Sequence, residues 1–237
     1  MRTVRNDVVD AICGVLGKEG EPDRAKGQQA YMKSTMPFRG ISSPQLTAAL
    51  RPLLADQAYR LVDRDEWEAT IRGLWDGAQF REERYAAIAI SGHRYYRQWA
   101  RDRSVMPLYR YLADSGAWWD FVDEIAAHRV GPVLRAYPQL ESERMRAWAA
   151  EGTMWVRRMA ILSQLSSKGE TDRQLLLDCI TPNLDDREFF IRKAIGWSLR
   201  QYSRSGTTAA DWVRRSVDEL DPRLSPLSRR EALKHLC

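Results

Sequence analysis

The sequence contains few of the residues that cross-link a chain or hold a metal. Its three cysteines, Cys13, Cys179 and Cys237, are odd in number and never in CxxC spacing, and its three histidines show no ligand spacing. This pattern favours a reducing compartment and predicts neither a disulfide framework nor a zinc site. We therefore expect no metal and no cofactor.

Long apolar runs are missing as well. No segment approaches the ~18 apolar residues of a membrane-spanning helix, and residues 1–23 alternate charged with apolar side chains. A secretion signal would need a continuous apolar stretch there. We expect a cytoplasmic protein that makes no contact with a membrane.

Acidic residues are outnumbered by basic ones. The chain has 37 Lys and Arg against 32 Asp and Glu, a net charge of +5. An arginine-rich positive balance favours an anionic partner such as nucleic acid, although ribosomal and membrane-surface proteins share it. With 44% hydrophobic residues in 237, the chain can bury a core as one domain or as an elongated array.

Nearly every segment has apolar residues at helical rather than strand spacing. Short breakers separate these segments, as between packed helix pairs, so we expect about a dozen helices and no sheet. Several sites resemble helix starts with a capping residue. They are Ser43-Pro44-Gln45, Asp63 with Glu66, Thr171 with Gln174, Asp185 with Glu188, and Ser228 with Glu231.

A repeat places three charged residues in register. Asp123, Arg158 and Lys193 are spaced 35 residues apart, with Trp119 four residues before the first and Trp197 four after the last. This spacing is typical of solenoid helix hairpins, and positions four apart share a helix face. Two interpretations stay open: a functional stripe, or a structural salt-bridge ladder beside tryptophans of the core.

Five ordered segments carry a resemblance to a known family. Together they resemble the DNA alkylation repair glycosylases of the AlkD type, from about residue 31 to residue 235. The resemblance implies an all-α fold, one right-handed α-solenoid of HEAT-like repeats over residues 1–237 with a basic concave DNA-binding face. The segments are YMKSTMPFRGI (31–41), SGAWWDFVDEI (115–125), WVRRMAILSQL (155–165), EFFIRKAIGWSLRQY (188–202) and PLSRREALKHL (226–236).

The resemblance also implies the site residues. Asp123 matches the catalytic carboxylate, Trp119 and Trp197 match the lesion cleft, and Arg158 matches the family's arginine, which we expect to hold a phosphate beside the lesion. Ser166 departs from the basic contact expected there. Further DNA contacts are expected at Tyr31, Phe189, Phe190, Lys193 and Arg200, of which Lys193 follows from the repeat and could equally be a solvated residue.

Helical geometry separates neighbouring residues within SGAWWDFVDEI. On a helix that begins near Ala117, Trp119 and Asp123 share a face, whereas Trp118 is rotated away and is expected to pack into the core. Asp120 lies at the helix start, where a carboxylate is favoured by the exposed amides. In an earlier segment, Glu82 and the acid after it are interpreted as a solvated helix face.

The resemblance implies an enzyme. It would be a monomeric, monofunctional DNA glycosylase of base excision repair that hydrolyses the N-glycosidic bond of positively charged N3- or N7-alkylated purines in double-stranded DNA. Its substrates would be 3-methyladenine, 7-methylguanine or bulkier adducts, and it would not flip the base. The alternative is a non-catalytic helical-repeat module that binds DNA structures or a protein partner.

Overall fold

The computed structural model describes residues 3–236, and all regular structure in this part of the chain is helical. The predicted all-α class is therefore confirmed. The chain divides into two compact units, Met1–Trp99 and Ala100–Cys237. Over the described range, we find no helix with the length and apolar character needed to cross a membrane. The single domain, the right-handed solenoid and the concave face stay predictions.

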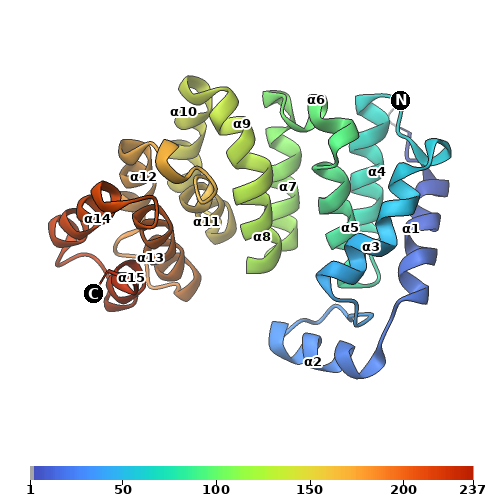
Figure 1. Cartoon of the computed structure of the whole chain (residues 1–237), viewed down its shortest axis with the longest axis horizontal. Coiled ribbons are helices and arrows are strands. Elements are labelled where there is room, and N and C mark those ends of the chain that lie inside the picture. Colours follow the sequence, from blue (N-terminus) through green and yellow to red (C-terminus); the bar gives the residue numbers. More distant parts are fainter. Residues whose placement is uncertain (1–2, 237) are drawn as a thin grey trace. The chain divides into compact units, whose positions relative to one another are not determined.

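The first unit is a bundle in which α1 packs on α3, α4 and α5, and α4 packs on α5. Trp67 and Trp75 of α4 are fully buried in its core. Helix α2 lies beside one end of this bundle rather than within it (Figure 1). The elements are α1 (Asn6–Lys18), α2 (Pro22–Met32), α3 (Ser43–Ala55), the 3-10 helix η1 (Gln57–Tyr59), α4 (Arg64–Asp76), α5 (Arg81–Ser91) and the 3-10 helix η2 (Arg94–Tyr96).

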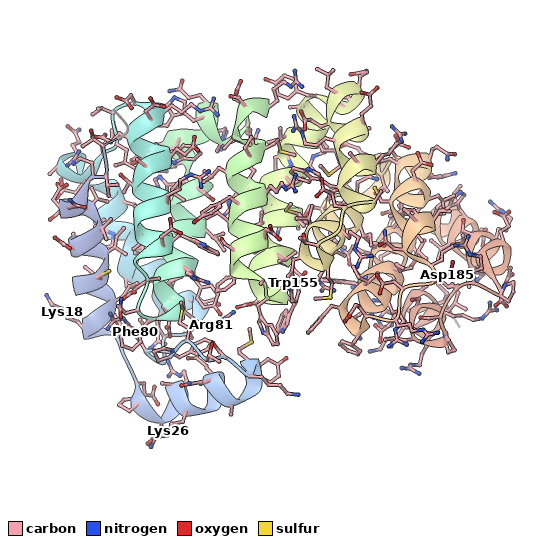
Figure 2. All side chains as sticks on the ribbon, turned by 180° about the vertical axis from the view of Figure 1, so that it is seen from behind. Lys18, Lys26, Phe80, Arg81, Trp155 and Asp185 are labelled. Atoms are coloured by element: carbon pink, nitrogen blue, oxygen red, sulfur yellow. The ribbon has the colours of Figure 1, made fainter. Side chains whose placement is uncertain are left out.

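Two acids at the start of α5 anchor the chain before α3, so the solvated face predicted for them is wrong. Glu82 is fully buried and accepts hydrogen bonds from three consecutive backbone N–H groups, at residues 39–41. Glu83 pairs with Arg39 at 2.6 Å. Gly40 has a φ of +88°, and a Cβ there would lie 2.0 Å from a backbone oxygen, so only glycine fits this turn. Phe80 and Arg81, which flank these contacts, are labelled in Figure 2.

The second unit is a series of packed helix pairs. Helix α7 packs on α8, α10 on α11, and α13 on α14 and α15, while α11 also contacts both α8 and α13. Its elements are η3 (Arg103–Val105), α7 (Met106–Gly116), α8 (Trp119–Ile125), the π-helix η4 (Ala126–Val130), α9 (Gly131–Ala136), α10 (Pro138–Ala149), α11 (Met154–Leu162), η5 (Lys168–Glu170), α12 (Arg173–Ile180), η6 (Thr181–Asn183), α13 (Phe189–Ser203), α14 (Thr207–Leu220) and α15 (Pro226–Leu233); the short α6 (Arg97–Ala100) spans the division between the units.

The predicted helix starts fall near the observed ones but often miss the capping residue. Asp63 caps α4 as predicted, since its Oδ1 accepts a hydrogen bond from the Glu66 N–H at 2.8 Å. At α3 and α12 the caps lie one residue from the predicted ones, at Ser42 and Asp172. Two predicted boxes are wrong, because α13 follows Glu188 and α15 is capped by Ser225. The starts of α3, α12 and α15 offer several short polar side chains, and the path of the chain selects one; at α13, Glu188 makes no side-chain cap hydrogen bond.

Candidate functional site

The 35-residue spacing brings Asp123 and Arg158 together. Arg158 of α11 donates from Nε to Oδ1 and from Nη2 to Oδ2 of Asp123 on α8, both at 2.8 Å. This is a bidentate pair, the geometry in which a guanidinium fixes both the position and the plane of a carboxylate. The prediction that the repeat places these two residues side by side is therefore confirmed by their direct contact.

Arg158 is enclosed between helices. Its side chain is 3% exposed, its Nη1 donates to the backbone carbonyl of Phe190 on α13, and its guanidinium lies 5.9 Å from the centre of the Phe190 ring. Each of its terminal nitrogens therefore has a protein acceptor. In this arrangement Arg158 holds the carboxylate of Asp123 in place and presents little surface to an outside phosphate.

The carboxylate of Asp123 is more accessible than its partner. Its side chain is 13% exposed, and a carboxylate has about four lone-pair directions, of which Arg158 uses two. Burial raises the pKa of Asp123 above its ordinary value, while the hydrogen bonds and charge of Arg158 oppose the rise and the charge of Asp120 adds to it. The pair thus keeps a desolvated acid in place with lone pairs left for another group.

Trp119 and Trp197 lie on two helices that both contact α11. Trp119 is the first residue of α8, one turn before Asp123, and Trp197 lies in the middle of α13. Both indoles are half-buried. The sequence predicted that both tryptophans lie on one stripe with the charged residues. They lie on α8 and α13, and both of these helices contact α11, which carries Arg158.

An aromatic cluster lies at the N-terminal ends of α8, α11 and α13. Trp118 lies 6.0 Å from Trp155 and 5.6 Å from Phe190 between ring centres, and Trp155 lies 5.1 Å from Phe190. Trp118 was expected to pack into the core; it is instead half-buried and packs against these aromatic side chains. Phe189 extends the cluster edge to face and is 52% exposed. Trp155 is labelled in Figure 2.

Lys193 and Arg200, both predicted DNA contacts, share one acid that the sequence analysis missed. Lys193 Nζ lies 2.7 Å from Oε1 of Glu231, and Arg200 Nη1 lies 2.6 Å from its Oε2. Lys193 therefore does not join the Asp123 pair. Side-chain exposure is 37% for Lys193 and 17% for Arg200, so the lysine is the more available cation.

Gly196 explains how Glu231 comes so close to α13. A Cβ at this position would lie 2.5 Å from the Cβ of Glu231 and 2.6 Å from the backbone oxygen of Ser228, so α15 packs directly on the backbone of α13. A glycine in a helix interior is destabilising by itself. That cost was the sequence signal for a close approach here.

The other predicted positions lie outside this arrangement. Tyr31 lies in the last turn of α2 in the first unit and is 76% exposed, and Ser166 is half-exposed in the turn after α11. Within residues 3–236, no group of three or more His, Cys, Asp or Glu side chains is arranged to hold a metal ion.

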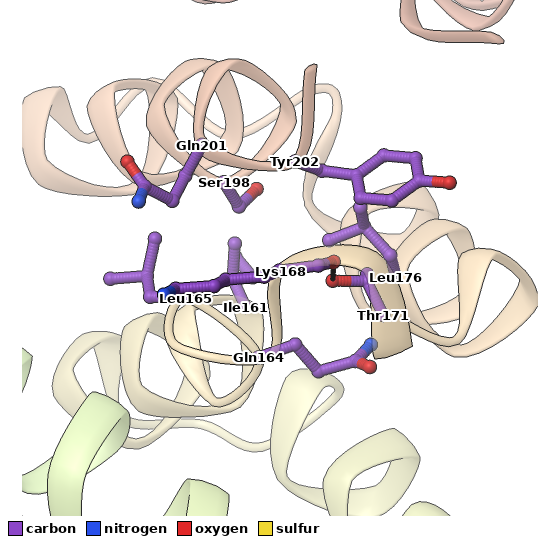
Figure 3. A pocket seen from close by; sticks show the side chains of 9 residues that line it. All are labelled: Ile161, Gln164, Leu165, Lys168, Thr171, Leu176, Ser198, Gln201 and Tyr202. Atoms are coloured by element: carbon purple, nitrogen blue, oxygen red, sulfur yellow. Dashed lines mark hydrogen bonds between the residues drawn. The ribbon is translucent and has the colours of Figure 1, made fainter. Parts of the chain in front are cut away.

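A small cavity of the second unit is too narrow for a substrate. Side chains from α11, the following turn and α13 surround it, among them Gln164, Lys168 and Tyr202 (Figure 3). Its volume is about 10 Å³, which is room for one water. Gln164, one of the lining residues, makes two hydrogen bonds with the backbone of Asp172. This cavity is a packing feature.

Comparisons with known proteins place the chain among DNA repair proteins. Residues 14–236 match the family model described as DNA alkylation repair enzyme. A solved structure described as a predicted DNA alkylation repair enzyme from Enterococcus faecalis is similar to this chain, with 32% sequence identity and a TM-score of 0.79. The match covers 92% of this chain and 97% of that one. No curated protein matches the sequence.

Proposed function

Because this chain belongs to the DNA alkylation repair enzyme family, we propose that it is a monofunctional DNA glycosylase. Its substrates are positively charged N3- and N7-alkylated purines in double-stranded DNA, such as 3-methyladenine and 7-methylguanine. It hydrolyses the bond between base and deoxyribose without turning the base into a pocket. The observation that carries the proposal is the partly accessible carboxylate of Asp123, held by Arg158 beside α13.

The chemistry needs a carboxylate and no general acid. Alkylation at N3 or N7 leaves a positive charge on the purine, so the base departs without being protonated. Positive charge then develops on the deoxyribose as the bond breaks. The carboxylate of Asp123 stabilises that charge and orients or deprotonates the attacking water through the lone pairs that Arg158 does not use.

The two tryptophans select for the charged base. The indole faces of Trp119 and Trp197 attract a cationic nucleoside, and one desolvated contact of this kind contributes about 2 kcal/mol. Neutral purines gain much less, so undamaged DNA is left intact.

Arg158 acts in this proposal as a positioning residue. Its enclosure and its three protein acceptors account for a role through Asp123 better than for the phosphate contact expected from the sequence. The proposed DNA contacts are Tyr31, Phe189 and Lys193, which are exposed or partly exposed, together with the less exposed Phe190 and Arg200.

A second candidate function is supported by the same pair. Both oxygens of Asp123 are engaged by Arg158, as in a purely structural ion pair between repeats. In that case the chain is a non-catalytic module that binds DNA.

The deciding experiment measures release of free 7-methylguanine and 3-methyladenine from methylated duplex DNA. Asp123→Asn is expected to lose release while it keeps duplex affinity in a fluorescence-anisotropy titration, and the matched variant Asp120→Asn is expected to keep both. Equal release by wild type and Asp123→Asn removes Asp123 from its role. Duplex binding by a wild type that releases no base supports the module.

The pH dependence of release gives a second test. The reaction needs Asp123 ionised, and burial raises the pKa of this carboxyl, so release declines at a higher pH than an ordinary aspartate, near 3.9, would impose. Arg158→Gln removes the opposing charge and moves this acid limb to still higher pH. A merely structural role for Arg158 would lower the rate at all pH values and leave the limb in place.

A further inference from the structure

The first unit contains a groove that the proposed reaction does not use. It has a volume of about 340 Å³ and lies between α3 and the turn that joins α5 to η2. Leu46, Leu50 and Leu54, one turn apart along α3, supply much of its apolar lining together with Ala89 of α5. The volume falls within the range of small-molecule sites and is too small for a docked helix.

The charged groups of the lining are basic, and no acid takes part in it. Arg51 of α3 and Arg94 of η2 both line the groove. Arg60 stacks on the ring of Tyr95, with its guanidinium carbon 4.2 Å from the ring centre, and Arg94 donates to the Tyr95 hydroxyl at 3.2 Å. Within residues 3–236, no carboxylate forms an ion pair with any of these three arginines.

His93 also lines the groove. Its Nδ1 is buried and has no hydrogen-bond partner, and its ring lies edge-on to Tyr95 with 4.9 Å between ring centres. Burial first, and then the charges of Arg94 and Arg60, lower the pKa of His93. The guanidiniums of Arg51 and Arg94 are exposed and have no carboxylate partner in the described part of the chain, so they are available to pair with an anion beside the leucine surface.

We propose that this groove binds a small organic anion with an apolar body. The anionic head, a carboxylate, sulfonate or phosphate ester, pairs with Arg51 and Arg94, and the body packs against the leucines of α3. This activity goes beyond the proposed glycosylase, because no residue of the Asp123 site lies in the groove.

The test compares two fluorescent probes with the same body. 8-Anilino-1-naphthalenesulfonate has a flat apolar body with an anionic head, and N-phenyl-1-naphthylamine has the same body without charge. Titration of the full chain is expected to show one site for the sulfonate, with at least about tenfold weaker binding of the neutral probe, which corresponds to about 1.4 kcal/mol.

Three variants assign the site. Arg51→Gln/Arg94→Gln is expected to weaken sulfonate binding about tenfold or more and to leave the neutral probe unchanged. Ala89→Leu enlarges a side chain of the lining and is expected to weaken both probes. Arg97→Gln is the matched control, because Arg97, the first residue of α6, is exposed and does not line the groove. This variant is expected to bind both probes like wild type. Circular dichroism verifies that each variant is folded.

Three results would overturn the proposal. The first is equal affinity for the two probes, and the second is sulfonate binding that neither the double variant nor Ala89→Leu changes. The third is displacement of the sulfonate by an unmodified duplex oligonucleotide, together with a loss of duplex affinity in Arg51→Gln/Arg94→Gln that equals its loss of sulfonate affinity. That third result would make the groove part of a DNA-binding surface rather than a small-molecule site.

Discussion

Removing Arg158 should expose how strongly Asp123 depends on its partner. In Arg158→Met the carboxylate keeps its burial but loses two hydrogen bonds of 2.8 Å and the adjacent positive charge. The two side chains are 3% and 13% exposed, so the pair counts as buried. Removing one member of a buried pair costs about 3–5 kcal/mol, a large part of the ~5–15 kcal/mol that stabilises a native protein.

The loss should depend on pH in a definite direction. Burial already raises the pKa of Asp123, and without Arg158 it rises further above the unfolded value of about 3.9. The folded variant then binds more protons than the unfolded chain between these two values, so its stability falls as the pH rises through the folded pKa. The deficit relative to wild type is therefore largest at pH 7 and shrinks as the pH falls toward 4.

Urea unfolding at pH 7 and pH 5 measures both effects. Asp123→Leu/Arg158→Met, which removes the charges together, is expected to recover most of the loss, because no buried charge is left unpaired. Arg146→Met is the control, since Arg146 and Asp178 are 43% and 26% exposed and such a pair contributes about 0–1 kcal/mol. A deficit below about 1 kcal/mol, or an equal deficit at both pH values, would refute the reasoning.

Three further outcomes follow from the packing. Gly196→Ala places a Cβ 2.5 Å from a side chain of α15 and should lower the urea midpoint by an amount equivalent to about 1–3 kcal/mol, whereas Gly14→Ala, with nothing within 4 Å, should raise it slightly. Glu82→Gln weakens a buried acceptor of three backbone N–H groups and should speed hydrogen exchange of those amides. Unchanged exchange would show that Glu82 does not hold residues 39–41 in place. Burial raises the pKa of Cys13 to about 11 and of Cys179 to about 12. In a Cys237→Ser background, both thiols of the folded protein should therefore react with a disulfide reagent at pH 8 far more slowly than the thiols of the protein unfolded in urea. Equal rates in the folded and unfolded protein would contradict this effect of burial.

Local chemistry and long-range packing were predictable to different degrees. The cap of α4 was predicted correctly because Asp63 and Glu66 are the only local partners needed. The start of α15 was missed because Ser225 and Ser228 compete as caps, and the start of α13 was missed because Glu188, which precedes it, makes no side-chain cap hydrogen bond. The contact of Asp123 with Arg158 was indicated by periodicity, since equal spacing on stacked helices places residues side by side.

Acids posed the hardest problem for interpretation from sequence. Glu82 follows the polar pattern of an exposed helix face, yet it is buried because the chain at residues 39–41 turns its N–H groups toward it. Glu231 lies far along the chain from Lys193 and Arg200, and the close contact at Gly196 alone brings it to both. The residues around Glu82 give no signal of its burial, and Gly196 signals a close approach to α13 without identifying Glu231 as the partner.

The sequence by itself determined the helical class, the repeat register and the family, because helix periodicity and ordered motifs are local properties of the chain. Tertiary structure decided how the charges are compensated: it makes Arg158 and Asp123 a bidentate pair and gives Lys193 and Arg200 the acid Glu231. Within residues 3–236, it leaves Arg51 and Arg94 without a carboxylate partner. The reason is physical. The energy of a charge depends on the groups within a few ångströms of it and on its burial, and these are set by segments far apart in the sequence.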